Sequence, residues 1–189
     1  MKHLKILKSQ VELNLKNYSL KGEPVIRQIR KLEDLNGIFH DHKAFSKMSS
    51  KDIIYEVQAW LPVSEGTSGG LYFGTTNLLP GRVGNEYFMT KGHYHKLSDR
   101  SEFYWGVQGV GMLILMDSDR NTWAEKVYPG SLHYIPAHVA HRVANTGNST
   151  LIFGACWPSD SGHNYEEIAQ NGFSARLLER NGEPRLKSS

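Results

Sequence analysis

From residue 53 onward, the chain consists of short runs that are rich in β-branched and aromatic residues. Turn-forming segments such as Pro80-Gly81 and Pro129-Gly130 separate these runs. Short strands at close, regular spacing with Gly and Pro turns are typical of an antiparallel barrel or sandwich, such as a jelly roll. The sequence therefore predicts an all-β fold whose strands cover residues 53–61, 72–79, 87–95, 102–108, 112–116, 123–128, 132–135, 141–144 and 150–157.

The two ends of the chain predict short helices. Residues 25–35 have the pattern of a strand that runs into a short helix, with Gly37 as its stop. Residues 165–171 have helical composition and end at Gly172, residues 173–179 predict a last strand, and the tail 185–189 is expected to be disordered. The length of 189 residues fits one domain over 1–189, made of a lead-in (1–50) and a barrel with a C-terminal extension (53–182).

Composition argues against nucleic-acid and membrane partners. The 22 basic and 19 acidic residues are interspersed, without a basic block that contains aromatic residues. No apolar run approaches the ~20 residues that a membrane helix needs. Residues 1–8 lack the apolar segment and cleavage site of a signal peptide. The single cysteine, Cys156, lies in an apolar run and is expected to be a buried thiol in a reducing compartment, so we expect a cytoplasmic protein.

Two histidines and a glutamate have the spacing of metal ligands. His93 and His95 are two residues apart, so on a strand both side chains leave the same face. Glu102 follows after a polar segment of the length that turns one antiparallel strand into the next. Imidazole and carboxylate groups are good ligands for a divalent transition metal. His40 and His42 share the spacing, but their polar, helical surroundings predict a solvated surface.

The metal-ligand pattern resembles the two cupin motifs. The first is His93-x-His95, six residues, Glu102, six residues and Gly109, and the second is Gly130, five residues, Pro136, four residues, His141, three residues and Asn145. This resemblance implies a cupin double-stranded β-helix, a jelly-roll barrel, with His93, His95, Glu102 and His141 as the metal ligands. His138 stands where the second motif usually has glycine, which either changes the backbone of that turn or adds a polar side chain to the pocket.

Further polar residues near the metal ligands predict a binding pocket. Thr90, Lys91 and Gly92 offer a hydroxyl, an ammonium and an accessible amide, which together suit an anion such as phosphate, and Thr76 could add a hydroxyl. Taken singly, each is also compatible with an ordinary strand residue. Tyr104 follows Glu102 by two residues and so points to the same face, where a polar substrate could pair with its hydroxyl. The remaining candidates for donors in the pocket wall are His163 and Tyr165.

Five segments narrow the resemblance to one family. They are Pro80-Gly-Arg-Val-Gly, Phe88-Met-Thr-Lys-Gly-His-Tyr-His, Asp99-Arg-Ser-Glu, Tyr134-Ile-Pro and Ser159-Asp-Ser-Gly-His-Asn-Tyr. Together they are similar to the cupin-type glucose-6-phosphate isomerases, over roughly residues 53–182. The resemblance implies a homodimeric enzyme that interconverts glucose 6-phosphate and fructose 6-phosphate in glycolysis and gluconeogenesis. It also implies one divalent ion per subunit, with Fe²⁺ expected and Zn, Mn or Ni as alternatives.

The resemblance also implies roles for individual residues. The phosphate would lie near Thr76, Thr90, Gly92 and Tyr104, and the sugar end near His163 and Tyr165, with Lys91 and His138 as further substrate-binding candidates. Glu102, Tyr104 and His163 are the candidate catalytic residues. Glu102 would be the base in an enediol route, whereas a direct hydride shift would leave it a metal ligand only, and both routes stay open. Trp157 stands in place of a family tyrosine.

Other functions also fit a metal-binding cupin. A different phosphosugar isomerase, or a dioxygenase with the same three-histidine, one-glutamate set, would use the same ligands. A non-catalytic sugar-binding cupin is the alternative from a different class. Regulatory cupins usually carry a DNA-binding segment, and residues outside the predicted barrel show no helix-turn-helix pattern.

Overall fold

The computed structural model describes residues 5–189, and the all-β prediction is confirmed. The expectation that residues 1–8 carry no signal peptide falls partly outside the described residues. Within residues 5–189, no helix is long and apolar enough to cross a membrane.

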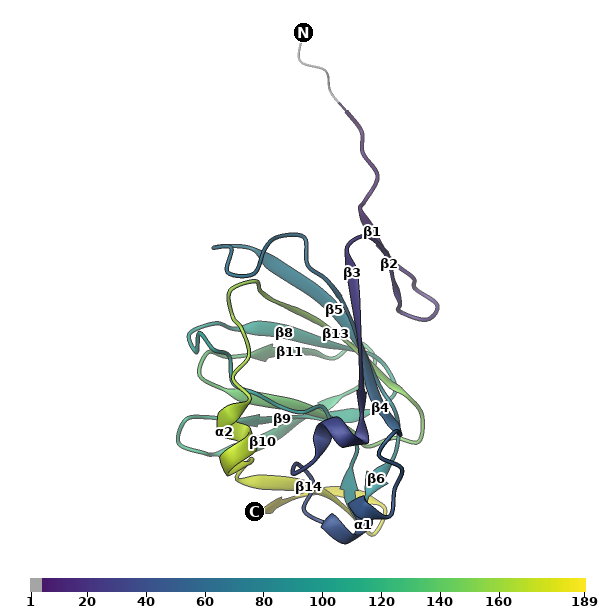
Figure 1. The fold of residues 1–189 in the computed structure, drawn as a ribbon, viewed down its shortest axis with the longest axis vertical. Helices are drawn as coiled ribbons and strands as arrows, with labels where there is room; N and C mark the ends of the chain where they lie inside the picture. Colours follow the sequence, from purple (N-terminus) through teal and green to yellow (C-terminus); the bar gives the residue numbers. More distant parts are fainter. Residues whose placement is uncertain (1–4) are drawn as a thin grey trace.

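The largest sheet has six antiparallel strands in the order β11-β8-β13-β5-β4-β3 (Figure 1). Their bounds are Leu132–Ile135 for β11, Glu102–Gln108 for β8, Leu151–Pro158 for β13, Leu71–Leu78 for β5, Ile53–Trp60 for β4 and Val25–Lys31 for β3. The predicted strands over these segments are confirmed to within one residue at each end. In Figure 1, β3 stands across the front of the barrel as the edge strand of this sheet.

A second sheet, in the order β10-β9-β12, provides the opposite wall (Figure 1). Its strands are β9 (Gly111–Met116), β10 (Thr122–Val127) and β12 (Ala140–Asn145). The central strand β9 is buried on both faces, because its four successive apolar residues Leu113, Ile114, Leu115 and Met116 are all fully covered. They share one apolar cluster with Leu78, Ile135 and Leu151 of the larger sheet. This packing holds the two walls together and leaves the space between them open at one end.

Shorter elements cover the rest of the barrel. A hairpin of β1 (Val11–Leu13) and β2 (Leu20–Gly22) precedes β3, and a 3₁₀ helix η1 (Leu32–Leu35) follows β3, where a short helix is predicted. The remaining elements are helix α1 (His42–Ser46), strands β6 (Arg82–Val83) and β7 (Glu86–Tyr87), helix α2 (Glu166–Asn171) and strands β14 (Ala175–Arg180) and β15 (Glu183–Ser188). Helix α2 ends at Gly172 (φ +60°), as the sequence predicts.

The prediction of a disordered tail is wrong. Residues 185–188 belong to strand β15, which pairs with β14 along its whole length, and the Ser189 N–H donates to the carbonyl oxygen of Ser174. Asn181 and Gly182 have φ values of +56° and +82°, the left-handed conformation at both central positions that a type I′ hairpin turn requires. The Asn-Gly turn therefore folds the tail back, although most of β15 is exposed.

The prediction of one strand over 87–95 is also wrong. Strand β7 ends at Tyr87, and beyond it the chain makes only isolated bridges, from Met89 to Ala144, from His93 to His141 and from Tyr94 to Asn164. Gly92 has a φ of +76°, which breaks the extended conformation. The two bridges to β12 nevertheless keep this segment against the second sheet.

Two smaller expectations have different outcomes. His40 and His42 lie on the exposed surface at the start of α1, as predicted. Cys156 is only partly buried, because it lies on the outward face of β13, where no layer of the described residues covers it completely.

Candidate metal centre

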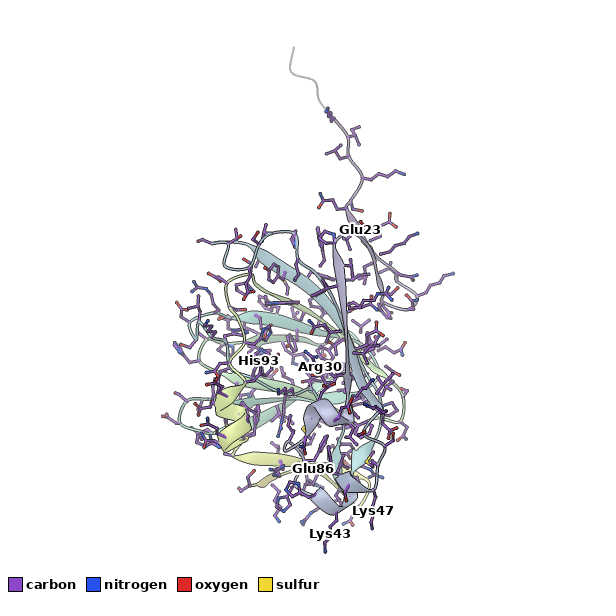
Figure 2. The ribbon with its side chains drawn as sticks, in the orientation of Figure 1. Glu23, Arg30, Lys43, Lys47, Glu86 and His93 are labelled. Carbon is purple, nitrogen blue, oxygen red and sulfur yellow. The ribbon has the colours of Figure 1, made fainter. Side chains whose placement is uncertain are left out.

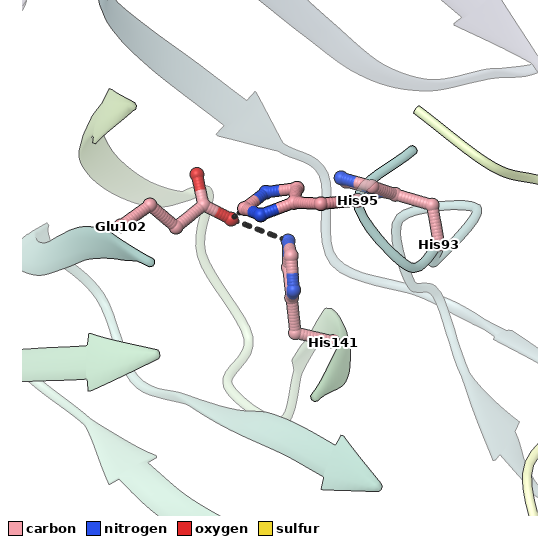
Figure 3. A group of neighbouring side chains, drawn as sticks. All are labelled: His93, His95, Glu102 and His141. Atoms are coloured by element: carbon pink, nitrogen blue, oxygen red, sulfur yellow. Dashed lines mark ion pairs between the residues drawn. The ribbon is translucent and has the colours of Figure 1, made fainter. Parts of the chain in front are cut away.

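Four side chains meet at one end of the space between the sheets. His93, His95, Glu102 and His141 each offer one ligand atom, and these atoms all lie within 4.8 Å of one another (Figure 3). His93 and His95 come from the bridged segment before β8, Glu102 begins β8, and His141 lies in β12. Reciprocal backbone hydrogen bonds between His93 and His141, of 3.3 and 3.1 Å, fix the two segments relative to each other.

Two atoms of this cluster are buried without a hydrogen-bond partner. Glu102 Oε1 lies 2.5 Å from His141 Nε2 and 3.4 Å from His95 Nε2, yet neither Glu102 Oε1 nor His141 Nε2 has a hydrogen bond of acceptable geometry. Buried polar atoms nearly always have a hydrogen-bond partner, so two neighbouring buried atoms without one need an explanation. Ligand bonds of ~2.0–2.2 Å to one ion would satisfy nitrogen and oxygen atoms at such separations. The residues therefore fit a divalent metal ion.

The other ring nitrogens orient two of the imidazoles. His95 Nδ1 lies 2.9 Å from the carbonyl oxygen of Arg100, and His141 Nδ1 lies 3.4 Å from that of Val139. A backbone carbonyl can only accept, so each Nδ1 carries the hydrogen and each Nε2 presents its lone pair to the cluster. Such contacts are the usual support of metal-binding histidines.

The protonation states of His93 and Glu102 also suit a metal, whereas for His95 the adjacent Glu102 outweighs the effect of burial and raises the pKa. Burial, together with neighbouring His141, His163 and His95, lowers the pKa of His93 well below its ordinary value. Burial alone would raise the pKa of Glu102, but the adjacent His141 and His95 outweigh it and lower this pKa to about 2. Neutral imidazole and ionised carboxylate are the forms that bind metal ions.

The cluster opens into a cavity of about 570 Å³. The candidate residues outside the metal set that line it are Thr76, Thr90, Lys91, Gly92, Tyr104, His163 and Tyr165. These residues come from strands β5 and β8 and from two loops, and they thus share one cavity although they are far apart in the sequence. Its volume suits a small polar molecule rather than a polymer.

His138 is not brought into this group, so its prediction as a pocket residue is wrong. Its side chain is exposed in the turn before β12, and it does not line the cavity. The backbone of His138 has a φ of +64°, and its N–H donates to the carbonyl oxygen of Ser98 at 2.6 Å. The left-handed conformation accounts for the glycine that cupin motifs usually have here. Neither alternative stated for His138 holds, because the turn keeps a backbone conformation that suits glycine and the His138 side chain does not line the cavity.

One end of the cavity collects hydroxyl and cationic groups. The hydroxyl of Thr90 accepts a hydrogen bond from Val143 N at 3.0 Å, which leaves its own hydrogen free for a ligand. The ammonium of Lys91 lies 4.8 Å from the centre of the Tyr165 ring. The backbone N–H of Lys91 donates to the hydroxyl oxygen of Tyr55 at 3.4 Å. This anion end therefore carries one ammonium and several O–H donors.

Tyr55 is a pocket residue that the sequence reasoning missed. It lines the cavity from β4, and burial raises its pKa to about 12, so its hydroxyl is a neutral donor. Period-two alternation places Tyr55, Val57 and Ala59 on one face of the predicted strand. That face could have been identified as the inner one only from the pairing of β4 with β5.

A group of aromatic rings lies between this anion end and the metal-ligand cluster, because Tyr165 contacts both Lys91 and His93. The rings of His163 and Tyr165 are stacked at 5.6 Å, and His163 lies 4.4 Å from the ring of His93. The surrounding protein desolvates the imidazole of His163 and lowers its pKa. Trp157 lines the same cavity and packs edge-on against Tyr72 at 5.9 Å. Burial, and secondarily Glu102, raises the pKa of Tyr104 well above its ordinary value, so Tyr104 is also a neutral donor.

An antiparallel barrel with three histidines and one glutamate around a single point defines a cupin with a candidate metal site. Within that class, the chain belongs to the family described as "Glucose-6-phosphate isomerase (GPI)", whose model matches residues 29–189.

Several curated proteins support this membership. The chain is 41% identical over 165 residues to the glucose-6-phosphate isomerase of Thermococcus litoralis, with 86% of each chain covered. It is 42% identical to that of Pyrococcus abyssi, with 85% of this chain and 88% of the relative covered. A bacterial relative, the "Putative glucose-6-phosphate isomerase 1" of Rhizobium meliloti, is 39% identical, with 79% and 71% covered.

Among solved structures, a mutant of Bacillus subtilis oxalate decarboxylase covers 58% of this chain and 27% of its own. The TM-score is 0.44 and the identity 18%, a likeness too low to carry a conclusion about function.

Proposed function

We propose that this protein is a metal-dependent aldose–ketose isomerase that interconverts glucose 6-phosphate and fructose 6-phosphate. The main support for this proposal is that one cavity contains both the candidate metal-ligand cluster and the anion end. Its volume of about 570 Å³ suits a small sugar phosphate. Relatives that cover most of the chain are named for this reaction.

His93, His95, Glu102 and His141 would hold one divalent ion, with Fe²⁺ expected and Zn, Mn or Ni as alternatives. When bound, such an ion acts as a Lewis acid on the carbonyl and hydroxyl oxygens of an open-chain sugar. The protein's part is to fix the donor set. The bridge between His93 and His141 and the carbonyl contacts of His95 and His141 provide that rigidity.

The anion end would bind the phosphate. The hydroxyls of Thr76, Thr90 and Tyr55 and the amide of Gly92 surround this part of the cavity, with Lys91 as the charge. Neutral O–H and N–H donors can hold phosphate oxygens without the cost of desolvating a charge of their own. A substrate anchored there would lay its carbonyl end toward the histidines.

Proton movement can follow two routes. In the first, a base removes the proton from C2 and returns it to C1. Glu102 is the carboxylate at the metal face, although its low pKa makes it a weak base. His163, with its lowered pKa, is a second acceptor at the sugar end, and Tyr104 a neutral donor to a developing oxyanion. In the second route, hydrogen moves directly from C2 to C1 as hydride, and Glu102 is a ligand only.

Isotope transfer separates the two routes. With C2-deuterated glucose 6-phosphate, the hydride route retains all deuterium at C1 of the product. The enediol route exchanges part of it with solvent when the base is open to water, and the exchange should depend on Glu102 or His163.

A coupled assay tests the proposed reaction. Production of glucose 6-phosphate from fructose 6-phosphate should be abolished by chelation and restored by a divalent metal. His93→Ala should lose metal and activity together, whereas His42→Ala, an exposed histidine of the similar His-x-His segment, should keep both. A fully metallated wild-type protein that makes no glucose 6-phosphate would remove the proposal.

We also propose that the chain forms one cupin domain over 1–189, is located in the cytoplasm and assembles into a homodimer.

Exposed apolar side chains support the proposed dimer. Phe103, Leu132 and Tyr134 are 46%, 69% and 54% exposed on neighbouring strands β8 and β11, and a second copy could cover them. Light scattering in solution should give twice the chain mass, and a monomeric mass would contradict this point.

A further inference from the structure

The edge strand β3 forms one wall of the cavity. Its residues Ile26, Gln28 and Arg30 line the cavity, whereas Arg27 and Ile29 alternate with them and do not. This is the period of two expected for a strand with one face toward a site. Figure 2 places Arg30 in the lower part of β3, at the front of the barrel.

Strand register puts Arg30 beside the anion end. Arg30 pairs with Tyr55 of β4, so the two side chains are direct cross-strand neighbours. In the next row, Gln28 pairs with Val57, which in turn pairs with Thr76 of β5. Arg30 therefore lies directly opposite Tyr55, and Thr76 lies two strands away in the next row that faces the cavity.

The charge of Arg30 has no counter-ion among the described residues. Its Nη2 donates to the side-chain oxygen of Gln28 at 3.1 Å, and no carboxylate lies within ion-pair distance. Burial raises the pKa of both Tyr55 and Tyr165, and the nearby guanidinium of Arg30 partly opposes this in each case. Arg30 thus acts electrostatically on two pocket residues from different elements.

Arg30 and Lys91 both lie close to these two tyrosines. Lys91 contacts the Tyr165 ring, and its N–H points to Tyr55. A guanidinium offers several N–H donors in a plane and matches two oxygens of a phosphate at once, which an ammonium does not. A dianionic group at the anion end would meet both cations.

We propose that Arg30 binds the phosphate of the substrate and sets the preference of this pocket for sugar phosphates over neutral sugars. The inference rests on the proposed isomerase function and adds the edge strand β3 to the binding site. Arg30 is a specificity-determining residue in this scheme, because it contacts the phosphate and not the carbons that react.

The test compares Arg30→Met with Arg27→Met in the metal-loaded protein. Both changes remove one positive charge from β3, but Arg27 does not line the cavity. A charge-assisted hydrogen bond contributes enough for roughly a 10- to 150-fold change in affinity. Arg30→Met should therefore raise KM for fructose 6-phosphate and the Kd for inorganic phosphate by about tenfold or more. We expect kcat and metal content to stay near wild type, and Arg27→Met to match wild type throughout.

Two outcomes would overturn the inference: phosphate affinity and KM of Arg30→Met equal to those of Arg27→Met, or a loss of kcat and metal without a loss of phosphate affinity. If circular dichroism shows that Arg30→Met does not fold, Arg30→Gln is measured against the same criteria. If the metal-loaded wild type does not turn over fructose 6-phosphate, the proposed function fails. The titration with inorganic phosphate then still decides whether Arg30 binds the anion.

Discussion

His141 Nε2 lies 2.5 Å from Glu102 Oε1, and both atoms are buried without a hydrogen-bond partner. A metal ion that satisfies both atoms would bind only the folded protein. It would stabilise that state by about 2.7 kcal/mol at a concentration 100 times its Kd. For a chain of this size, the melting temperature should rise by roughly 5–10 °C.

Calorimetry of metal-depleted protein, with and without added Zn²⁺ or Fe²⁺, measures this rise. His141→Ala should abolish it, whereas His42→Ala should retain it. Equal melting temperatures with and without metal would contradict the assignment.

Replacement of Gly92 should damage the anion end. An added Cβ would lie 3.0 Å from the Phe173 ring and 3.1 Å from Arg142 Cβ, at a φ of +76°. Gly130→Ala is the matched control, because Gly130 has a φ of +90° but nothing within 4 Å of an added Cβ. Both should lose about 1 kcal/mol of unfolding free energy from backbone strain.

Gly92→Ala should lose about 1 kcal/mol more from its close contacts and should also raise KM for the sugar phosphate. Urea denaturation and steady-state kinetics give the two readouts. Equal losses in the two variants, with KM unchanged, would count against close packing behind Gly92.

Stability should fall at alkaline pH because of Tyr55. Burial raises the pKa of Tyr55 from 10 to about 12. The contribution of the neutral Tyr55 to the free energy of unfolding is therefore complete below pH 10 and is lost as the pH rises toward 12. Two pKa units correspond to at most about 2.7 kcal/mol. Tyr55→Phe, which cannot ionise, should show a smaller loss of unfolding free energy between pH 9.5 and 11.5. Identical slopes for the two proteins in urea denaturation would refute the burial of a neutral Tyr55.

Deletion of residues 185–189 should destabilise the barrel. These residues pair with β14, and Ser189 at their end donates from its hydroxyl to Phe173 O and from its amide to Ser174 O, both at 2.8 Å. Phe173 packs behind Gly92, so the deletion should also raise KM for the sugar phosphate. We expect a loss of about 1–3 kcal/mol, because several hydrogen bonds of ~0.5–1.5 kcal/mol each are lost and part of that is recovered through hydration. A truncated protein as stable as the full chain would restore the prediction of a disordered tail.

The convergence of His93, His95, Glu102 and His141 could be predicted because these residues lie in two motifs of fixed spacing. The spacing of His93 and His95 predicts that both side chains leave the same face of a strand. In the structure, however, both residues lie in irregular backbone held by isolated bridges, and not in a strand. The left-handed Gly92 causes this break, and a single glycine does not reveal its φ from sequence.

The residues that sequence reasoning missed depend on pairing between distant strands. Tyr55 and Arg30 reach the cavity only because β3 pairs with β4 and β4 with β5. Without that register, nothing distinguishes the inner face of β3 from its outer face, since both carry an arginine and an isoleucine. His138 was misplaced for a related reason: its backbone conformation, and not its side chain, is the feature shared with the motif.

A titration of metal-depleted protein with a divalent metal, while the isomerase rate is followed, measures whether one ion per chain supports the reaction. The rate should rise linearly and saturate at one equivalent of metal per chain, with no rise in His141→Ala. Full activity without metal, or saturation at a stoichiometry other than one, would contradict this prediction.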